Sequence, residues 1–377
     1  MQETPFYYYD ISLLEETIQT VLSEAGKNSS YDLYYAIKAN ANPKLLSIIK
    51  DSGLGVDCVS GGEIQAAIDT GFSSDKIVFA GVGKSDQEID LAIKHNISCF
   101  NVESAAEIMV LHERAVMAGK QIKIAIRVNP NIDAHTHSKI TTGLSENKFG
   151  INIEQLDQTI NLLLNMPAIS LEGLHFHIGS QILDLEVFKE LCKRINTLQE
   201  QLESKGVKFN HINVGGGLGT NYIEPEKYPI SDFKNYFKTF RNNLVLKPAQ
   251  RLRFELGRSI VAQCGKLITK VLYVKKGTTK QFVIVDAGMN DLIRPALYQA
   301  SHKIINISSK NGSDVYDVVG PICESSDVFA SNITLPITKR GDYLAILSAG
   351  AYGEVMSSQY NLRKLPLSYT SQEIKLL

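Results

Sequence analysis

The sequence lacks several features that mark whole classes of protein. Its formal net charge over 377 residues is −1, so it has no global field that would attract nucleic acid or an anionic membrane. No apolar run approaches the roughly 20 residues that cross a bilayer, and the opening MQETPFYYYD lacks the pattern of a signal peptide. The five cysteines are scattered without CxxC spacing, which argues against a disulfide framework or a structural zinc site. We therefore expect a cytoplasmic protein with no nucleic-acid or membrane partner.

What the sequence does have is a regular alternation of strand-like and helical runs between about residues 32 and 261. The strand candidates are YDLYYAIKAN, GVDCVS, KIVFAG, ISCFNVES, IKIAIRVNP, LEGLHFHIGS, HINVGGGLG and RLRFELGRSIV. Helices should end at glycines and begin at serines, namely Gly53, Gly71, Gly119, Gly206, Ser85 and Ser104. Helical crossovers imply parallel strands, so this α/β pattern predicts a closed (β/α)8 TIM-like barrel over residues 11–260. An open doubly wound sheet is the alternative, although its usual GxGxxG is missing.

The remainder of the chain has a different pattern. Strand-like runs follow one another across short turns, as KLITKVLYVKKG, KQFVIVDAG, SDVYDVVGPI, ITLPITKRG and DYLAILSAGAYG. This pattern predicts a mainly antiparallel β domain, resembling a sandwich or barrel, over residues 261–377. The aromatic strand within residues 1–10 could add to that domain.

Polar side chains at the ends of the first and sixth strands are candidates for chemistry. Lys38 follows the first strand, in AIKAN. A surface lysine is the ordinary interpretation, but apolar flanks favour the barrel mouth, where a desolvated amine can form a Schiff base. His175 and His177 share one face of the sixth strand. A metal pair is conceivable, but no third ligand is near in sequence. His175 fits a satisfied core histidine, and His177 could lie flat against a cofactor ring.

The last two barrel strands end in an anion cradle and a carboxylate. The cluster Gly215–Gly219 lets backbone N–H groups approach an anion closely, although tight turns use the same residues. Glu255 follows an apolar run and would suit a pyridinium nitrogen, with a salt bridge to Arg253 or Arg258 as the structural alternative. Amine, flat ring, anion cradle and carboxylate together match pyridoxal 5′-phosphate (PLP).

The predicted β domain offers a second set of polar residues at strand–turn junctions. Arg294 and Tyr298 lie four residues apart in DLIRPALY, Cys323 and Glu324 are adjacent in GPICESSD, and Tyr352 stands among small residues in GAYG. The ordinary interpretations are a solvated salt bridge for Arg294 and a small buried core residue for Cys323.

Taken in order, YAIKAN, HIGSQ, GGGLG, ELGR, DLIRPALY, GPICESSD and GAYGE resemble the PLP-dependent group IV decarboxylases of the alanine racemase-like fold. The resemblance spans nearly the whole chain and is greatest to the branch that acts on diaminopimelate. It implies catalytic roles for Lys38, the Schiff-base lysine, for Cys323, the proton donor, and for His177 and Glu255. The implied cofactor-binding residues are Lys38, Asp57, Arg127, His177, Ser180, Gly215, Gly216, Gly217, Glu255, Leu256, Gly257, Arg258 and Tyr352. The implied substrate-binding residues are Arg258, Arg294, Tyr298, Glu324 and Tyr352.

One position departs from the pattern of the family. Leu256 stands where the family usually has proline. Leucine replaces no catalytic group, so we expect a changed loop geometry without loss of function.

The expected reaction is the decarboxylation of meso-2,6-diaminopimelate to L-lysine and carbon dioxide, the last step of lysine biosynthesis. Arg294 and Arg258 suit its distal carboxylate, and Glu324 suits its distal ammonium. The resemblance also implies an obligate homodimer in which Cys323 and Glu324 reach the active site of the partner. Four alternatives stay open: decarboxylation of ornithine, lysine or carboxynorspermidine; a racemase-like enzyme; a non-catalytic PLP-binding homologue; and a metal-dependent hydrolase built on the two histidines. No metal is expected on the decarboxylase interpretation.

Overall fold

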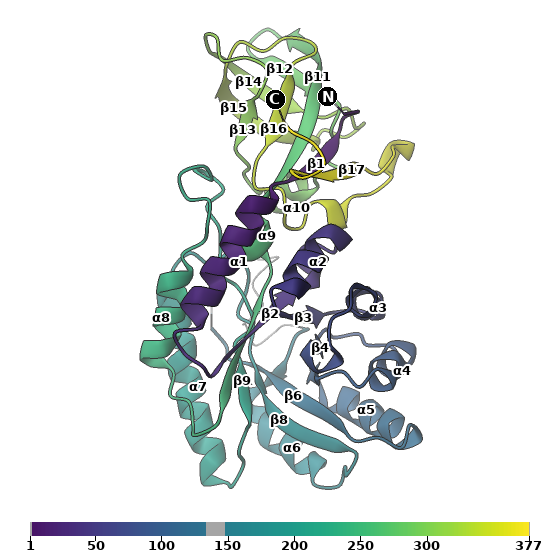
Figure 1. Cartoon of the computed structure of the whole chain (residues 1–377), viewed down its shortest axis with the longest axis vertical. Coiled ribbons are helices and arrows are strands. Elements are labelled where there is room, and N and C mark those ends of the chain that lie inside the picture. The colour runs from purple at the N-terminus through teal and green to yellow at the C-terminus, as the bar shows by residue number, and fades with distance from the viewer. Residues whose placement is uncertain (1, 133–147, 377) are drawn as a thin grey trace. The chain divides into compact units, whose positions relative to one another are not determined.

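The computed structural model describes residues 2–132 and 148–376. The chain divides into two compact units (Figure 1). The barrel unit comprises Ile18–Gly219 and Asp232–Gly257. The β unit comprises Met1–Thr17, Thr220–Ser231 and Arg258–Leu377. In the described part of the chain no helix is long and apolar enough to span a bilayer.

Within the described residues, the barrel unit is a closed ring of eight parallel strands. The ring follows the order β5-β4-β3-β2-β10-β9-β8-β6 and closes through pairing of β5 with β6. A two-residue strand, β7 (Ile151–Asn152), pairs with β6 outside the ring. The ring strands are β2 (Tyr31–Ala36), β3 (Gly55–Cys58), β4 (Ile77–Phe79), β5 (Cys99–Val102), β6 (Ile122–Asn129), β8 (Ile169–His175), β9 (His211–Asn213) and β10 (Arg251–Leu256). The predicted (β/α)8 barrel is therefore confirmed.

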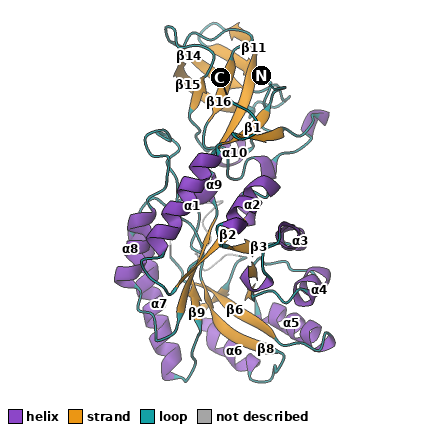
Figure 2. Ribbon diagram, viewed as in Figure 1, coloured by secondary structure: helices purple, strands orange, loops and turns teal. Residues whose placement is uncertain are grey.

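Helices connect successive strands of the ring and lie outside it (Figure 2). They are α2 (Pro43–Asp51), α3 (Gly61–Thr70), α4 (Asp86–Lys94), α5 (Ala105–Met117), α6 (Ile153–Leu163), α7 (Glu186–Ser204) and α8 (Phe233–Asn243). An earlier helix, α1 (Ile11–Ala25), leads from the β unit into the barrel unit. Because parallel strands all run the same way, their carboxyl ends meet at one mouth of the ring, which is where barrel chemistry is found.

Local sequence signals explain the helix boundaries. The Ser85 hydroxyl accepts a hydrogen bond from the backbone N–H of Glu88, whose carboxylate in turn accepts one from the Ser85 N–H. The Ser104 hydroxyl caps α5 by accepting a hydrogen bond from the Glu107 N–H. Gly71 ends α3 with a φ of 90°, a left-handed conformation that favours glycine. Gly53, Gly119 and Gly206 also have positive φ angles, so the predicted helix ends are confirmed.

The β unit is a mixed, mainly antiparallel sheet of eight strands among the described residues. Its order is β13-β16-β11-β12-β14-β15, with β1 paired to β11 and to β17. Two of its pairings are parallel, those of β1 with β17 and of β12 with β14. Its strands are β1 (Phe6–Tyr9), β11 (Gly265–Lys276), β12 (Gln281–Val285), β13 (Ile304–Asn306), β14 (Asp314–Val319), β15 (Val328–Leu335), β16 (Tyr343–Ile346) and β17 (Leu367–Thr370). Short helices α9 (Arg258–Val261) and α10 (Arg294–Tyr298) complete the unit.

Several elements differ from the sequence-based expectation. The helix α8 was not among the predicted helical runs, yet its rings at 233, 236, 237 and 240 follow helical spacing and are buried. Phe237 and Phe240 lie with ring centroids 5.0 and 5.1 Å from that of Phe254 on β10, so packing against the barrel stabilises a helix that is otherwise polar. The short strands β13 and β17 were also missed. The strand predicted over ITLPITKRG lies earlier, because Pro336 has no N–H to extend the β15 ladder.

Candidate active site

The amine of Lys38 lies at the mouth of the barrel beside a buried carboxyl group. Lys38 belongs to a single 3-10 turn, Ile37–Ala39, that follows β2 directly, so the end of the strand aims it. Its Nζ is 3.3 Å from Oδ2 of Asp57, which is fully buried on β3. Burial raises the pKa of Asp57 to about 8, and the charge of Glu255 adds to the rise, whereas Lys38 opposes it. Lysine and carboxyl group together form a polar site at the ends of β2 and β3.

Glu255, at the end of β10, lies in a cradle of neutral donors. Its Oε1 accepts hydrogen bonds from Nδ2 of Asn213 at 2.6 Å and from Nδ2 of Asn101 at 2.9 Å. Its Oε2 is 3.1 Å from Nε2 of His175. Burial alone would raise the pKa of Glu255, but His175, Lys38 and Asn213 outweigh it and hold the pKa below its ordinary value. The carboxylate is therefore ionised without an arginine partner in its cradle, because Arg253 faces Asp32 instead.

The two histidines of β8 and its following loop have separate surroundings. His175 was expected to be a satisfied core residue, and this is wrong. It is buried, faces Glu255, and its Nδ1 has no hydrogen-bond partner among the described residues. His177 lies beside the glycine turn, where the N–H of Gly216 is 3.4 Å from its Nδ1. Burial, followed by the charges of Arg127 and Lys38, lowers the pKa of His177 well below its ordinary value. A neutral, flat ring suits the face of an aromatic cofactor.

The glycine turn after β9 is packed so closely that side chains could not replace its glycines. A Cβ on Gly216 would lie 2.2 Å from the backbone oxygen of Glu255. One on Gly215, whose φ is 66°, would meet the Phe176 oxygen at 2.6 Å, and one on Gly217, whose φ is 105°, would meet the Gly179 oxygen at 2.9 Å. Backbone hydrogen bonds tie this turn to the loop that carries Ser180, since Ile182 donates to Gly217 and Gly219 donates to Ile182. The turn thus exposes backbone rather than side chains to the mouth of the barrel.

Arg127, near the end of β6 (Ile122–Asn129), adds a guanidinium to this mouth. Its Nη1 donates to Oε1 of Glu103 at 2.9 Å, and its guanidinium lies 4.6 Å from the centroid of the Phe149 ring. Glu103 in turn accepts a hydrogen bond from the N–H of Gly150 at 2.8 Å. The guanidinium is therefore held in place while its Nη2 has no partner among the described residues.

These residues fit PLP. Four buried polar atoms at the strand ends have no hydrogen-bond partner in the described part of the chain, namely Asp57 Oδ1, Asn101 Oδ1, Arg127 Nη2 and His175 Nδ1. Native proteins leave few such atoms, so a bound group with both donors and acceptors would account for them. The amine of Lys38, the neutral ring of His177, the ionised Glu255 and the backbone of the glycine turn supply the contacts that an aldehyde, a pyridine ring and a phosphate require. Among the described residues, no three His, Cys, Asp or Glu side chains gather as metal ligands.

The β unit has its own buried cluster of cations. Nη1 of Arg258 donates to the Tyr222 hydroxyl at 2.8 Å, and the Arg258 guanidinium lies 4.8 Å from the Tyr352 ring centroid. The guanidinium of Arg294 lies 4.6 Å from the Tyr222 ring, and its Nη1 is 2.9 Å from Nε2 of His302. Although burial would raise it, Arg258 and then Arg294 lower the pKa of Tyr222. Two arginines therefore share one phenol as their acceptor.

Arg294 contradicts the ordinary interpretation of a solvated salt bridge. Its side chain is buried, with 5% of the residue exposed, and burial lowers the pKa of its guanidinium. Within the described residues, no carboxylate of the protein pairs with it. His302 donates from Nδ1 to the Leu347 carbonyl at 2.8 Å, so its Nε2 carries a lone pair and accepts from Arg294. The α10 helix, whose Pro295 stands at the first turn, places this guanidinium in a site suited to an external carboxylate.

Cys323 and Glu324 lie on an exposed loop of the β unit. Cys323 is the exposed member of the five cysteines, all of which are free and the other four buried. The ordinary interpretation of a core cysteine is therefore wrong. The N–H of Cys323 donates to Oδ1 of Asn361 at 3.1 Å, and Oε1 of Glu324 accepts from the hydroxyl of Tyr360 at 2.5 Å.

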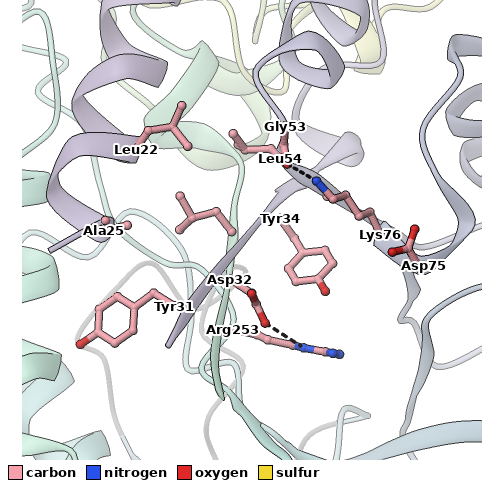
Figure 3. Close-up of a pocket in the computed structure, with 13 residues that line it drawn as sticks. Leu22, Ala25, Tyr31, Asp32, Tyr34, Gly53, Leu54, Asp75, Lys76 and Arg253 are labelled. Atoms are coloured by element: carbon pink, nitrogen blue, oxygen red, sulfur yellow. Dashed lines mark hydrogen bonds and ion pairs between the residues drawn. The ribbon is translucent and has the colours of Figure 1, made fainter. Parts of the chain in front are cut away.

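A pocket of about 400 Å³ opens at the other end of the barrel ring (Figure 3). It is lined by residues where strands begin, including Tyr31 and Gly55, and none of the catalytic, cofactor-binding or substrate-binding residues predicted from the sequence lines it. Its polar groups already have neighbours: Nζ of Lys76 donates to the Gly53 oxygen at 2.7 Å, and Nε of Arg253 is 3.9 Å from Oδ2 of Asp32 (Figure 3). The amino ends of barrel strands serve stability rather than chemistry.

Sequence reasoning missed the residues that hold the others in place. Asn101, Glu103 and Asn213 were not selected, yet each lies at the carboxyl end of a ring strand and contacts a predicted site residue. Their position at the strand ends could have identified them from the sequence, because polar groups at the carboxyl ends of the ring strands meet at one mouth of the barrel. Tyr222 and His302 carried no such signal, since neither follows a strand of the ring and only the folded β unit brings them to the two arginines.

Comparisons with known proteins agree with this chemistry. A family model described as the pyridoxal binding domain of pyridoxal-dependent decarboxylases matches residues 12–262. The chain is 57% identical to a diaminopimelate decarboxylase of Bacteroides thetaiotaomicron, over 99% of this chain and 96% of that one. A crystal structure of the Helicobacter pylori diaminopimelate decarboxylase with L-lysine has a TM-score of 0.92 at 42% identity, covering 98% of this chain and 92% of that one.

A more distant likeness concerns the fold alone. The lysine/ornithine decarboxylase of Vibrio vulnificus, complexed with putrescine, has a TM-score of 0.85 at 20% identity. It covers 98% of this chain and 95% of that one.

Proposed function

The chain belongs to the diaminopimelate decarboxylases, which are PLP-dependent enzymes, and from this premise we propose which of its residues carry the reaction. The reaction is the decarboxylation of meso-2,6-diaminopimelate to L-lysine and carbon dioxide. Its product, L-lysine, is the ligand named for the Helicobacter pylori structure. Lysine keeps the distal carboxylate of the substrate, so a site that binds both must contain a partner for that carboxylate.

The observation that carries the proposal is the state of Arg294. A buried guanidinium without a carboxylate partner is costly, and a substrate carboxylate would satisfy it with a bidentate pair. Arg258 shares Tyr222 with Arg294, so we assign both arginines to substrate binding, with Tyr298 and Tyr352. A substrate without a distal carboxylate, such as ornithine, would leave this guanidinium unpaired, which disfavours the alternative substrates.

The barrel mouth would hold the cofactor. Lys38 would bind it through the amine, the glycine turn with Ser180 and Gly257 would receive its phosphate, and His177 would lie against its ring. Bound PLP supplies an electron sink for the pair that is released when the Cα–carboxylate bond breaks. Glu255 would face the ring nitrogen, and its low pKa keeps a negative charge there that favours the protonated ring. Asp57 and Arg127 would complete the polar walls, and Leu256 continues the β10 strand behind them.

Cys323 and Glu324 would complete the reaction from a second subunit. We propose a homodimer in which Cys323 delivers a proton to Cα after carbon dioxide leaves, and Glu324 binds the distal ammonium. The exposure of this loop supports the proposal, as does Leu362, which is 98% exposed and follows Asn361, the partner of the Cys323 N–H. The free state of all five cysteines fits a reducing cytoplasm, in which we place the enzyme.

The test is a substrate comparison on the purified protein. We expect a visible absorbance band from bound PLP that is lost in Lys38→Ala, and formation of lysine and carbon dioxide from meso-diaminopimelate but not from ornithine or lysine. Turnover of ornithine with no turnover of diaminopimelate would overturn the assignment of Arg294. A protein that binds no PLP when the cofactor is added would overturn the assignment of the barrel mouth.

A further inference from the structure

The loop that carries Cys323 and Glu324 is built around one buried carboxyl group. Oδ2 of Asp327 accepts the N–H of Ile322 at 2.7 Å, and its Oδ1 accepts the N–H of Met289 at 2.6 Å. A Cβ on Gly320 would lie 2.3 Å from Asp327 Oδ2, so the start of the loop folds tightly over this carboxyl. These contacts fix both ends of the loop from inside the β unit, but they do not touch the side chains of Cys323 and Glu324.

The tip of the loop is held from outside by two consecutive residues. The Tyr360 hydroxyl donates to Oε1 of Glu324 at 2.5 Å, and Oδ1 of Asn361 accepts the backbone N–H of Cys323 at 3.1 Å. Adjacent residues of one turn therefore contact adjacent residues of the other. Because the Tyr360 hydroxyl contacts only Oε1 of Glu324, the carboxylate keeps its second oxygen, Oε2, for a ligand.

The backbone of the turn supports a positioning role. Asn361 has φ 53° and ψ 27°, and Leu362 has φ 57°. Left-handed conformation is tolerated by asparagine but disfavoured for leucine, and such conformations persist where the surroundings or a function require them. Leu362 is almost fully exposed, so packing of its side chain does not account for its conformation in the β unit.

Stability does not account for the contact between Tyr360 and Glu324 either. Tyr360 is 48% exposed and Glu324 is exposed as well. Hydrogen bonds to exposed carboxylates contribute little to folding, because water replaces the lost partner. The first cause of the raised pKa of Tyr360 is its hydrogen bond to Glu324, so the phenol keeps the proton that it donates.

We propose that Tyr360 and Asn361 are positioning residues for the pair Cys323–Glu324. Asn361 sets the backbone from which the Cys323 thiol reaches Cα, and Tyr360 orients the Glu324 carboxylate toward the distal ammonium of the substrate. The inference rests on the roles proposed above for Cys323 and Glu324. It assigns a different role to each residue. Loss of the Asn361 acceptor should slow proton delivery, whereas loss of the Tyr360 hydroxyl should weaken substrate binding.

The experiment uses the holoenzyme with meso-diaminopimelate, three variants of the turn and one control variant. For Tyr360→Phe we expect KM to rise about tenfold with kcat within twofold of the wild type, the loss of about one hydrogen bond to a charged group. For Asn361→Gly, which keeps the left-handed backbone and removes the acceptor, we expect kcat to fall about tenfold with little change in KM. Asn361→Asp, which keeps the acceptor, should restore kcat to within about threefold. Tyr273→Phe, at another exposed tyrosine of the β unit, should match the wild type.

A second readout does not depend on turnover. Cys323 is exposed and the other cysteines are buried, so iodoacetamide labelling followed by peptide mass analysis reports on this thiol alone. Asn361→Gly should change its alkylation rate at least threefold, and Asn361→Asp should not. Equal changes of kcat and KM in Tyr360→Phe and Asn361→Gly, or wild-type values in both, would overturn the proposal.

The roles of the loop itself are tested separately. Cys323→Ser and Glu324→Gln should each reduce kcat/KM more than Asn361→Gly or Tyr360→Phe does. If both retain full activity while the wild type decarboxylates diaminopimelate, the proposed roles of the pair fail and this inference fails with them. If the pair is required but the turn variants behave as the wild type does, only the inference fails.

Discussion

The exchange Arg294→Gln tests the assignment of the substrate carboxylate most directly. Arg294 is buried, pairs with no carboxylate of the described residues, and donates from Nη1 to Nε2 of His302 at 2.9 Å. A glutamine amide can still donate toward His302, so the variant removes the charge and the guanidinium fork while leaving a polar group in place. The cluster around Tyr222 should therefore survive, and the change should appear in substrate recognition rather than in folding.

The size of the effect follows from the contacts that are lost. A bidentate pair with a carboxylate contains two charge-assisted hydrogen bonds, each of about 1.5–3 kcal/mol. The glutamine retains at most one uncharged donor, so a net loss of about 3–4 kcal/mol is expected, which corresponds to a fall in kcat/KM of about 100- to 1000-fold. Arg294→Lys keeps the charge but loses the planar fork, and should fall about tenfold.

Two inhibitors separate the carboxylate from the rest of the ligand. L-Lysine carries the distal carboxylate and cadaverine lacks it, although both carry the two amines. In Arg294→Gln we expect the inhibition constant of lysine to rise by about the same factor as kcat/KM falls, and that of cadaverine to move less than about twofold. Equal weakening of both inhibitors, or an unchanged kcat/KM for diaminopimelate, would refute the assignment of Arg294.

Two further predictions concern the glycine turn and the buried histidine. Gly216→Ala places a Cβ 2.2 Å from the Glu255 backbone oxygen, so PLP affinity, measured by the visible band during dialysis, should fall at least tenfold. Gly83→Ala, at a position with open space, should not alter it. Burial and Arg294 lower the pKa of His302 from 6.5 to about 3, so the unfolded chain takes up this proton first as pH falls. The free energy of unfolding should therefore decrease as the pH falls from 6.5 toward 3. At pH 5 it should be about 2 kcal/mol lower than above pH 6.5. Urea unfolding should show this loss, reduced in His302→Gln; an identical pH dependence in the variant would contradict it.

Much of the fold could be predicted because its signals are local. Alternating apolar runs and helical runs, with glycines at helix ends, predict the barrel without knowledge of its contacts. The helix α8 was not predicted because its apolar stripe of four aromatic rings is narrow and its other residues are polar. Its stability comes from packing against Phe254. The strands β13 and β17 are short and exist through their pairing with distant strands.

In the candidate site, too, the residues with a local sequence signal could be predicted and those that depend on distant contacts could not. Lys38, His177, Glu255 and the glycine turn could be selected because each directly follows an apolar strand. Asn101 and Asn213, which donate to Glu255, and Glu103, which pairs with Arg127, could not be identified as site residues from the sequence. A polar residue at a strand end has many ordinary explanations. The role of His175 was misjudged for a related reason: alternation along β8 predicts that it points inward, but only the register with β9 and β10 shows that it meets a carboxylate.

The first strand of the chain has a consequence for how the protein is made. The β1 strand, all four of whose residues are buried, pairs with β11 on one side and with β17 on the other. A ribosome releases β1 before the barrel, yet both partners of β1 emerge only after the entire barrel has been synthesised. During that time a ribbon of aromatic residues with two unsatisfied edges stays in the nascent chain. The β unit can therefore form only after β11 and β17 have been synthesised, and a chaperone that binds short aromatic segments would find a target at Phe6–Tyr9.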